Sequence, residues 1–271
     1  MRRRQWIEVH DQSWFPPSIR DLVTDTLQFL WNFFDFYGPI APRLRRALQE
    51  SGTHRILDLC SGGGGPWLSL VRRFEDGEDF PLEICLTDRF PNPEAFEHAK
   101  NLPHTKFVFH TGPVDATQVP TDLEGFRTLF TAFHHFPPGG AQAILEDAVK
   151  HRRGVGVFEV SRRNWLTILL VFLIALMALA LVPFIRPFRW SRLLWTYLIP
   201  VIPLVLLFDG VISCLRAYTP PELLAFTQGL SEDGYRWEAG EAKNGWMPVP
   251  VTYLIGYPIP SRDHAALQSE A

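Results

Sequence analysis

The chain has 271 residues, of which 46% are hydrophobic, 20% charged and 13% aromatic. This composition excludes a disordered chain, a coiled coil and a collagen-like fibre. With 26 basic and 29 acidic side chains the formal net charge is −3, so we expect no global basic field and no nucleic-acid partner. The three cysteines are too few and too scattered for a disulfide framework, which indicates a reducing compartment.

The first 50 residues are expected to form an N-terminal helical cap. Three arginines follow Met1, but polar residues stand where a signal peptide needs an apolar run. Ser18 is expected to cap a helix that continues to about Phe36. The apolar face of this helix is predicted to cover a core, with a surface anchor through Trp6 and Trp14 as the alternative. The residues of this face are Ile19, Leu22, Val23, Leu27, Leu30, Trp31 and Phe34.

A glycine-rich loop follows the first predicted strand. Residues 56–59 read as a short buried strand, residues 60–66 (CSGGGGP) as a loop, and residues 67–74 as a helix. A strand, a glycine turn and a helix N-terminus open the nucleotide-binding half of a doubly wound fold. Glycine allows close approach of a ligand to the backbone, but this motif alone does not choose between cofactors.

Strands and helices then alternate along the chain. Further strands are predicted at residues 83–87, 106–110, 127–133 and 154–160, and helices at 91–100 and 140–150. This alternation predicts a parallel sheet whose ligands bind at the carboxyl ends of the strands. Asp88 stands at such an end, 24 positions after Gly64. Its two acceptor oxygens suit the hydroxyl groups of a ribose.

Residues 164–215 differ in composition from the rest of the chain. Only four of these residues are charged: Arg186, Arg189, Arg192 and Asp209. The uncharged run at 164–185 has the length and apolarity of a membrane helix, with a buried core helix as the alternative. The second run, 193–215, contains Pro200 and Pro203, which should kink it, and Asp209, which is costly in lipid unless it is paired.

Arginines flank both apolar runs and the turn between them. If the hairpin crossed the bilayer twice, the basic turn would face the non-cytoplasmic side, against the usual bias. A re-entrant or shallow hairpin would instead place these arginines near anionic headgroups. We therefore predict membrane association, with the domain of alternating strands and helices on the cytoplasmic side, and leave the depth of insertion open.

The chain returns to soluble composition after the hairpin. Thr219 and Glu222 are predicted to cap a short helix, and residues 235–240 and 251–256 to form two closing antiparallel strands. The apolar hairpin is then an insertion after the fifth strand. The expected domains are the cap (1–50), a cofactor-binding domain (51–163 and 216–260), the hairpin (164–215) and a disordered tail (261–271).

In this order the motifs resemble those of the class I S-adenosylmethionine-dependent methyltransferases, over residues 55–161 and 219–258. The segment ILDLCSGGGGP looks like the first motif of that family, with Asp58, Gly62 and Gly64 matching and Cys60 in place of the first glycine. The segment AFHHF at 132–136 is similar to the one after the fourth strand in many small-molecule methyltransferases. The resemblance implies an α/β fold with a doubly wound, mostly parallel, seven-stranded sheet.

The resemblance also implies the site residues. Those expected to bind S-adenosylmethionine are Asp58, Ser61, Gly62, Gly63, Gly64, Asp88, Arg89, Asp115, Ala116 and Thr131. His134 and His135 are candidates for a general base or for orienting the substrate, although packing at a strand end explains either histidine equally well. Glu159 is a candidate for orienting the substrate, with an ion pair to Arg162 or Arg163 as the alternative. No metal site is expected, because the histidines lack cysteine or carboxylate partners at ligand spacing.

The function predicted from the sequence is a membrane-associated S-adenosylmethionine-dependent methyltransferase acting on a hydrophobic small molecule or a lipid-like acceptor, such as a quinone. One alternative is an inactive methyltransferase-like domain kept as a membrane scaffold or cofactor sensor. A second is a dinucleotide-dependent oxidoreductase, although Pro66 and Trp67 depart from the end of the Gly-x-Gly-x-x-Gly pattern.

Overall fold

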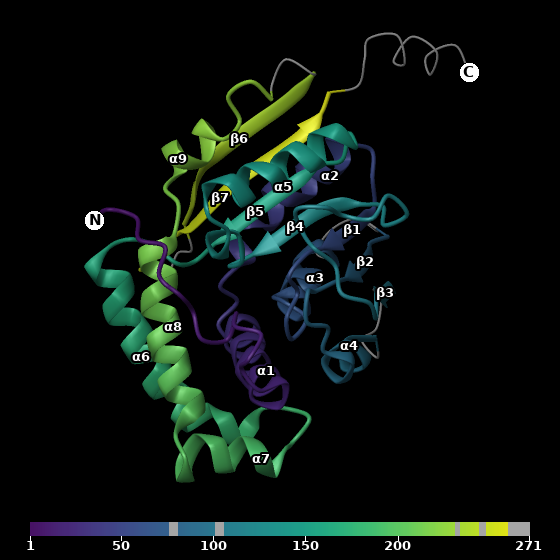
Figure 1. The fold of residues 1–271 in the computed structure, drawn as a ribbon. Coiled ribbons are helices and arrows are strands. Elements are labelled where there is room, and N and C mark those ends of the chain that lie inside the picture. The colour runs from purple at the N-terminus through teal and green to yellow at the C-terminus, as the bar shows by residue number, and fades with distance from the viewer. Residues whose placement is uncertain (76–80, 101–105, 231–233, 244–247, 260–271) are drawn as a thin grey trace.

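The computed structural model describes residues 1–75, 81–100, 106–230, 234–243 and 248–259. The predicted disordered tail at 261–271 lies outside the described residues. Figure 1 shows an α/β body built on one sheet, with a group of apolar helices beside it.

Seven strands form a single sheet in the order β3-β2-β1-β4-β5-β7-β6. The first five pair in parallel, and β7 runs antiparallel to both β5 and β6. This confirms the mostly parallel, seven-stranded α/β fold with a closing antiparallel pair. The strands are β1 (Arg55–Asp58), β2 (Glu83–Leu86), β3 (Lys106–Phe109), β4 (Phe126–Phe130), β5 (Val155–Glu159), β6 (Tyr235–Ala242) and β7 (Val251–Pro258).

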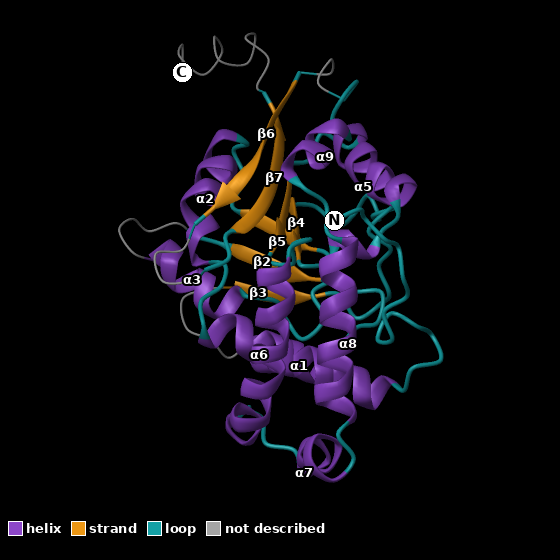
Figure 2. Ribbon diagram, turned by 90° about the vertical axis from the view of Figure 1, so that its left-hand side faces the viewer, coloured by secondary structure: helices purple, strands orange, loops and turns teal. Residues whose placement is uncertain are grey.

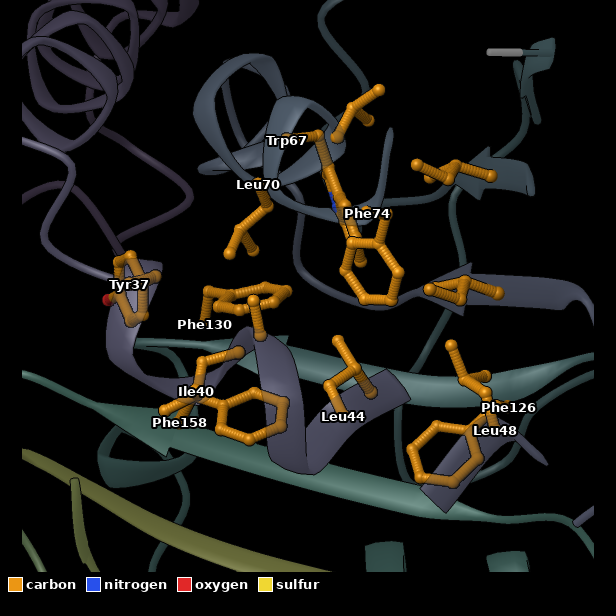
Figure 3. Close-up of a cluster of buried hydrophobic side chains, with 14 of the residues drawn as sticks. Tyr37, Ile40, Leu44, Leu48, Trp67, Leu70, Phe74, Phe126, Phe130 and Phe158 are labelled. Carbon is orange, nitrogen blue, oxygen red and sulfur yellow. The ribbon is translucent and has the colours of Figure 1, made fainter. Parts of the chain in front are cut away.

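Helices cover both faces of the sheet, as a doubly wound fold requires. One face packs against η1 (Gly38–Ile40), α2 (Ala41–Glu50), α3 (Trp67–Glu75) and α4 (Pro93–Lys100). The other face packs against η2 (Phe133–His135), α5 (Pro138–Lys150) and α9 (Pro220–Ala225). Figure 3 shows the first of these cores, in which Trp67 and Leu70 of α3 and Leu44 of α2 lie over Phe130 and Phe158 of the sheet.

The apolar insertion leaves the sheet after β5 and returns before α9. It consists of α6 (Trp165–Leu181), η3 (Val182–Phe184), α7 (Trp190–Leu193), a π-helical turn (η4, Leu194–Leu198) and α8 (Val201–Arg216). Figure 2 shows α6 and α8 side by side, with α7 at the far end of the pair. Within the part of the chain that the structure describes, only α6 with η3 is long and apolar enough to cross a membrane as one helix, since the second limb bends by 72° between η4 and α8.

The N-terminal helix α1 (Pro17–Phe33) packs against this insertion and not only against the sheet. Leu22, Val23 and Leu30 of α1 are buried together with residues of α6 and α8. The face predicted to cover a core does so, and the core is the one that it shares with the hairpin.

Electrostatic contacts also join the hairpin to the α/β body. The guanidinium of Arg192 is 1% exposed and donates to Asp25 of α1 at 2.8 Å. Arg189 pairs with Glu94 of α4. The expectation that these arginines lie at lipid headgroups is wrong for Arg192, because it is buried against Asp25; for Arg189 it stays a prediction. Among the three turn arginines only Arg186 is exposed.

One of the two helix caps predicted from the sequence is present, and the structure adds a further cap at Asn164. Asn164 caps α6 by accepting from the backbone N–H of Thr167 at 2.8 Å. The carboxylate of Glu222 accepts from the backbone N–H and the hydroxyl of Thr219, as predicted for a capping box. The predicted cap at Ser18 is wrong: α1 begins one residue earlier, at Pro17, because proline suits the first helical position.

Candidate active site

The glycine loop after β1 has the backbone that its sequence predicts. Gly62, Gly64 and Gly65 adopt positive φ angles of 53°, 103° and 62°. Gly63 has a different reason for lacking a side chain, because a Cβ there would stand 2.9 Å from the carbonyl oxygen of Thr24 in α1. The loop is thus held between β1 and the N-terminal helix.

Cys60 stands where the resembling family has a glycine, yet the backbone conformation is kept. Its φ is 58°, in the left-handed region that costs a non-glycine residue about 1–2 kcal/mol. The cysteine therefore replaces the glycine of the motif without changing the backbone conformation of the turn.

Two carboxylates, at the ends of β1 and β2, lie next to the glycine loop. Asp58 is fully buried at the end of β1, and its Oδ1 accepts from the hydroxyl of Thr128 at 2.6 Å. Burial raises the pKa of Asp58 to about 7. Asp88, at the end of β2, accepts from the backbone N–H of Gly62 at 2.7 Å and of Phe90 at 2.7 Å. Each acid therefore has a structural contact in addition to any role toward a ligand.

A cavity of about 550 Å³ opens at the carboxyl ends of the parallel strands. This volume falls within the ~300–1,000 Å³ typical of small-molecule sites. Nine of the predicted site residues line it: Ser61, Gly62, Gly63, Asp88, Arg89, Asp115, Ala116, Thr131 and His135. Asp58, Gly64, His134 and Glu159 are not among the lining residues.

The walls of the cavity differ in character along its length. The strand ends supply the polar groups named above, whereas the hairpin contributes apolar wall residues: Val171, Ile174 and Ala175 of α6, and Val205 and Leu206 of α8. Leu27, Leu30 and Trp31 of α1 complete this apolar part. The insertion after β5 therefore forms one wall of the candidate site, as its position in the sequence predicts.

His134 lies behind the cavity wall in a buried ionic cluster. Its ring Nδ1 is 2.8 Å from Oε2 of Glu159, and its Nε2 is 3.5 Å from Oε1 of Glu8. Burial disfavours a charge on this ring, but the two carboxylates more than offset it and raise the pKa of His134 to about 10. A histidine that is protonated at neutral pH and does not line the cavity is unsuited to act as the general base.

His135 faces the cavity and is held by residues that the sequence analysis missed. Its Nδ1 is 2.8 Å from Oδ2 of Asp11, and Glu8 lies 3.5 Å away. Arg216 contacts both of these acids, at 3.2 Å from Glu8 and 3.1 Å from Asp11. Glu8 and Asp11 are more than 120 positions from the histidines in the chain. No local spacing in the sequence indicates that they meet.

Asp209, a carboxylate in the apolar helix α8, is paired with the N-terminal segment. Its two oxygens accept from the backbone N–H groups of Val9 and His10, and Oδ2 is 2.7 Å from the ring Nδ1 of His10. The N-terminal segment thus contacts α8 at this point. Both Asp209 and His10 line the cavity.

The sheet order, the glycine loop and the cavity at the strand ends together define the fold of the class I S-adenosylmethionine-dependent methyltransferases. No protein-family model matches the chain, and no curated protein sequence matches it. The plantazolicin methyltransferase BpumL, solved in complex with SAH, is similar in structure, with a TM-score of 0.56 and 10% sequence identity. That similarity covers 93% of this chain and 95% of BpumL.

Two further solved structures resemble the chain at lower similarity. A SAM-dependent methyltransferase from Aquifex aeolicus has a TM-score of 0.49 and 12% identity, over 89% of this chain and 98% of that one. Human N-acetylserotonin methyltransferase in complex with SAM has a TM-score of 0.48 and 14% identity, over 90% of this chain and 56% of that one.

Proposed function

We propose that the protein is an S-adenosylmethionine-dependent methyltransferase that acts at a membrane surface on an apolar small molecule or lipid-like acceptor. The observation that carries the proposal is the single cavity with two unlike walls. One wall consists of the glycine loop and strand-end acids, and the other of apolar side chains from the inserted hairpin. A cofactor and an apolar acceptor would meet between them.

The charge of the polar part of the cavity and the open backbone of the glycine loop both suit S-adenosylmethionine. Five aspartates line the cavity, and three of them, Asp21, Asp88 and Asp115, lie outside the histidine cluster, against two arginines. An excess of carboxylates favours a ligand that carries a sulfonium and an ammonium group. Asp88 and Asp115 supply acceptor oxygens for hydroxyl and amine donors, and the glycine loop leaves room at the backbone. These residues, with Ser61 and Ala116, would hold the cofactor, which supplies an electrophilic methyl group when bound.

The residues around the reacting groups serve mainly to position them and to exclude water. Methyl transfer from a sulfonium is an in-line displacement, so orientation and desolvation supply much of the catalysis. Of the histidines and glutamate considered from the sequence, His135 alone lines the cavity. We assign the acceptor-facing role to His135, which Asp11 holds at 2.8 Å, whereas Glu159 holds His134 behind the wall.

Membrane association is supported by the outer face of the hairpin. Trp165, Trp190 and Leu198 are 77%, 78% and 76% exposed, and other large apolar side chains of α6 and α8 are exposed beside them. Exposed apolar surface of this extent marks an interaction site. Because α7 is tied to α1 and α4, a shallow hairpin that rests on the bilayer agrees better with this fold than a double crossing. The three free cysteines suit a cytoplasmic location.

The cofactor assignment is tested by calorimetric titration of the intact protein, in detergent, with S-adenosylmethionine and separately with NAD. Binding of S-adenosylmethionine is expected, and Asp88→Ala should weaken it about 10- to 150-fold, the value of hydrogen bonds to a charged acceptor. Asp122→Ala, at an exposed acid away from the cavity, is the control. Binding of NAD in place of S-adenosylmethionine would support the oxidoreductase alternative and contradict the proposal.

The acceptor assignment is tested by transfer of labelled methyl from S-adenosylmethionine into extracted membrane lipids. Ala175 lines the apolar wall, whereas Ala180 is exposed on the same helix. Ala175→Phe should therefore lower incorporation at least tenfold without changing the cofactor Kd, and Ala180→Phe should leave both unchanged. Cofactor binding with no incorporation into any lipid fraction would favour the scaffold or sensor alternative.

A further inference from the structure

The ionic cluster behind the cavity contains a buried imidazole nitrogen without a hydrogen-bond partner. Glu8 and His134 are both 0% exposed. Oε1 of Glu8 pairs with Arg216 at 3.2 Å, and each of its oxygens lies 3.5 Å from a histidine nitrogen. Among the residues that the structure describes, Nε2 of His134 has no hydrogen-bond partner, and a buried polar atom of this kind is normally paired or bound to an ion.

The spacing of these atoms is that of a metal-ligand set. His134 Nε2 and His135 Nδ1 each lie 3.5 Å from an oxygen of Glu8, and the ligand atoms of the three residues lie within 4.8 Å of one another. Two ligands at the ~2.0–2.1 Å bond lengths of tetrahedral zinc are about 3.4 Å apart. Two histidines and one glutamate also form a known class of catalytic zinc site that keeps an open position.

His134 and His10 are held as metal ligands usually are, whereas Nδ1 of His135, the nitrogen nearest to Glu8, is itself 2.8 Å from Asp11. In such sites the second ring nitrogen of the histidine bonds to a carboxylate, which fixes the ring and leaves the first nitrogen for the ion. His134 has this arrangement, with Glu159 at its Nδ1. His10 has it as well, with Asp209 at its Nδ1 and its Nε2 directed at Asp11, 3.9 Å away.

The charges of the cluster leave room for a further cation. Glu8, Asp11, Glu159 and Asp209 bring four carboxylates, and Arg216 is the guanidinium in contact with two of them. Arg216 directs its other nitrogens at the carbonyl oxygens of residues 134 and 135. Protons on the imidazole rings balance the remaining negative charge in the metal-free cluster, and binding of a divalent ion would displace the proton on Nε2 of His134.

We infer that Glu8, His134 and His135 bind a divalent transition-metal ion, with zinc the first candidate, and that Glu159 positions His134 for it. His135 and Asp11 line the cavity, so the open coordination position faces the space assigned to the acceptor. An oxygen of a bound molecule is the ligand suited to that position. The site is separate from the cofactor wall and does not depend on methyl transfer being the reaction.

The test is metal analysis of the full-length protein in detergent, purified without a metal-affinity tag, both as isolated and after loading with zinc. We expect about one zinc per chain, removal by chelator, and X-ray absorption with nitrogen and oxygen neighbours at about 2.0–2.1 Å. Glu8→Gln and His135→Gln should remove the bound metal, and Glu159→Gln should weaken zinc affinity 10- to 100-fold. His151→Gln, at a histidine outside the cluster, is the control.

His135 is partly exposed, so His135→Gln remains informative if a variant at the buried positions fails to fold. Retention of one zinc in folded His135→Gln and Glu8→Gln would overturn the inference. The absence of metal binding when the folded wild-type protein is loaded with zinc, iron(II), manganese and nickel in turn would also overturn the inference. In that case protons on the histidines would balance the carboxylates of the cluster. Cofactor titration of the same samples separates this failure from a failure of the methyltransferase proposal.

Discussion

Cys60 adopts a left-handed backbone conformation that glycine usually adopts. The residue lines the cavity at φ 58°, and Thr131, at the end of β4, has φ 45° although it is β-branched. Strain of this kind clusters at functional sites, where the surroundings hold the backbone in place. Both residues lie where the parallel strands meet the cavity.

The effect of a substitution at Cys60 on the free energy of unfolding should therefore depend more on the backbone preference of the new residue than on its polarity. We expect Cys60→Gly to have a free energy of unfolding equal to that of the wild type or up to about 1 kcal/mol higher, because glycine removes the left-handed strain but loses some packing. Cys60→Val should be less stable than the wild type by at least about 1 kcal/mol, since a β-branched residue is disfavoured at this φ. Urea unfolding measures both. Equal stability of the valine variant would show that the turn can relax.

Asp58 predicts a pH dependence of stability. Its pKa is raised by burial from 3.8 to about 7, so the native state keeps a proton that the unfolded chain loses near pH 4. The free energy of unfolding should therefore fall as pH rises from about 4 to about 7, by at most about 4 kcal/mol at 1.36 kcal/mol per pKa unit. Asp58→Asn should remove this part of the slope. A stability difference between the two proteins that is constant over pH 4–8 would contradict the assignment.

At the scale of elements, α6 and α8 are joined by a close helix contact at Gly210. A Cβ at this glycine would lie 2.7 Å from Cγ1 of Val171. Because Val171 and Gly210 both line the cavity, the contact also shapes the apolar wall. The glycine belongs to an uncharged run, and its sequence context does not indicate which helix it faces.

Gly210→Ala should destabilise the hairpin by about 1–3 kcal/mol, the usual cost of overpacking. The double variant Gly210→Ala with Val171→Ala should recover part of the loss, since the second change removes the clashing methyl groups. Thermal unfolding in detergent gives the comparison. Gly139 in α5 is the control, because a Cβ there meets nothing within 4 Å. Identical losses for Gly210→Ala with and without the Val171 change would show that the two helices do not meet as described.

At the scale of the whole molecule, the hairpin has two faces with different roles. Its inner face packs on α1 and closes the cavity, and its outer face exposes large apolar side chains. The buried pair of Arg192 and Asp25 fixes the far end of the hairpin to the body. A molecule of this shape suits an enzyme that rests on a bilayer and draws an apolar acceptor from it.

Membrane binding should depend on the outer face alone. Leu169 and Leu176 of α6 are 66% and 62% exposed. Leu169→Glu with Leu176→Glu should lower partition into anionic liposomes at least tenfold, because a charge in the apolar layer costs about 2–3 kcal/mol. S-adenosylmethionine affinity should be unchanged. Flotation with liposomes measures the partition, and Leu224→Glu in α9 is the control. Undiminished flotation of the double variant would place the membrane contact elsewhere.

The sequence determined the local features of the protein: the strand, glycine loop and helix at residues 55–75, the alternation that yields the parallel sheet, and the placement of an apolar insertion after β5. These follow from periodicity, turn residues and apolarity, which act over a few neighbouring positions. The tertiary structure alone decided which distant charges meet. It pairs Arg192 with Asp25 and brings Glu8 to His134 and His135, because ion pairs and metal-ligand sets depend on distance in space and leave no periodic pattern in the chain.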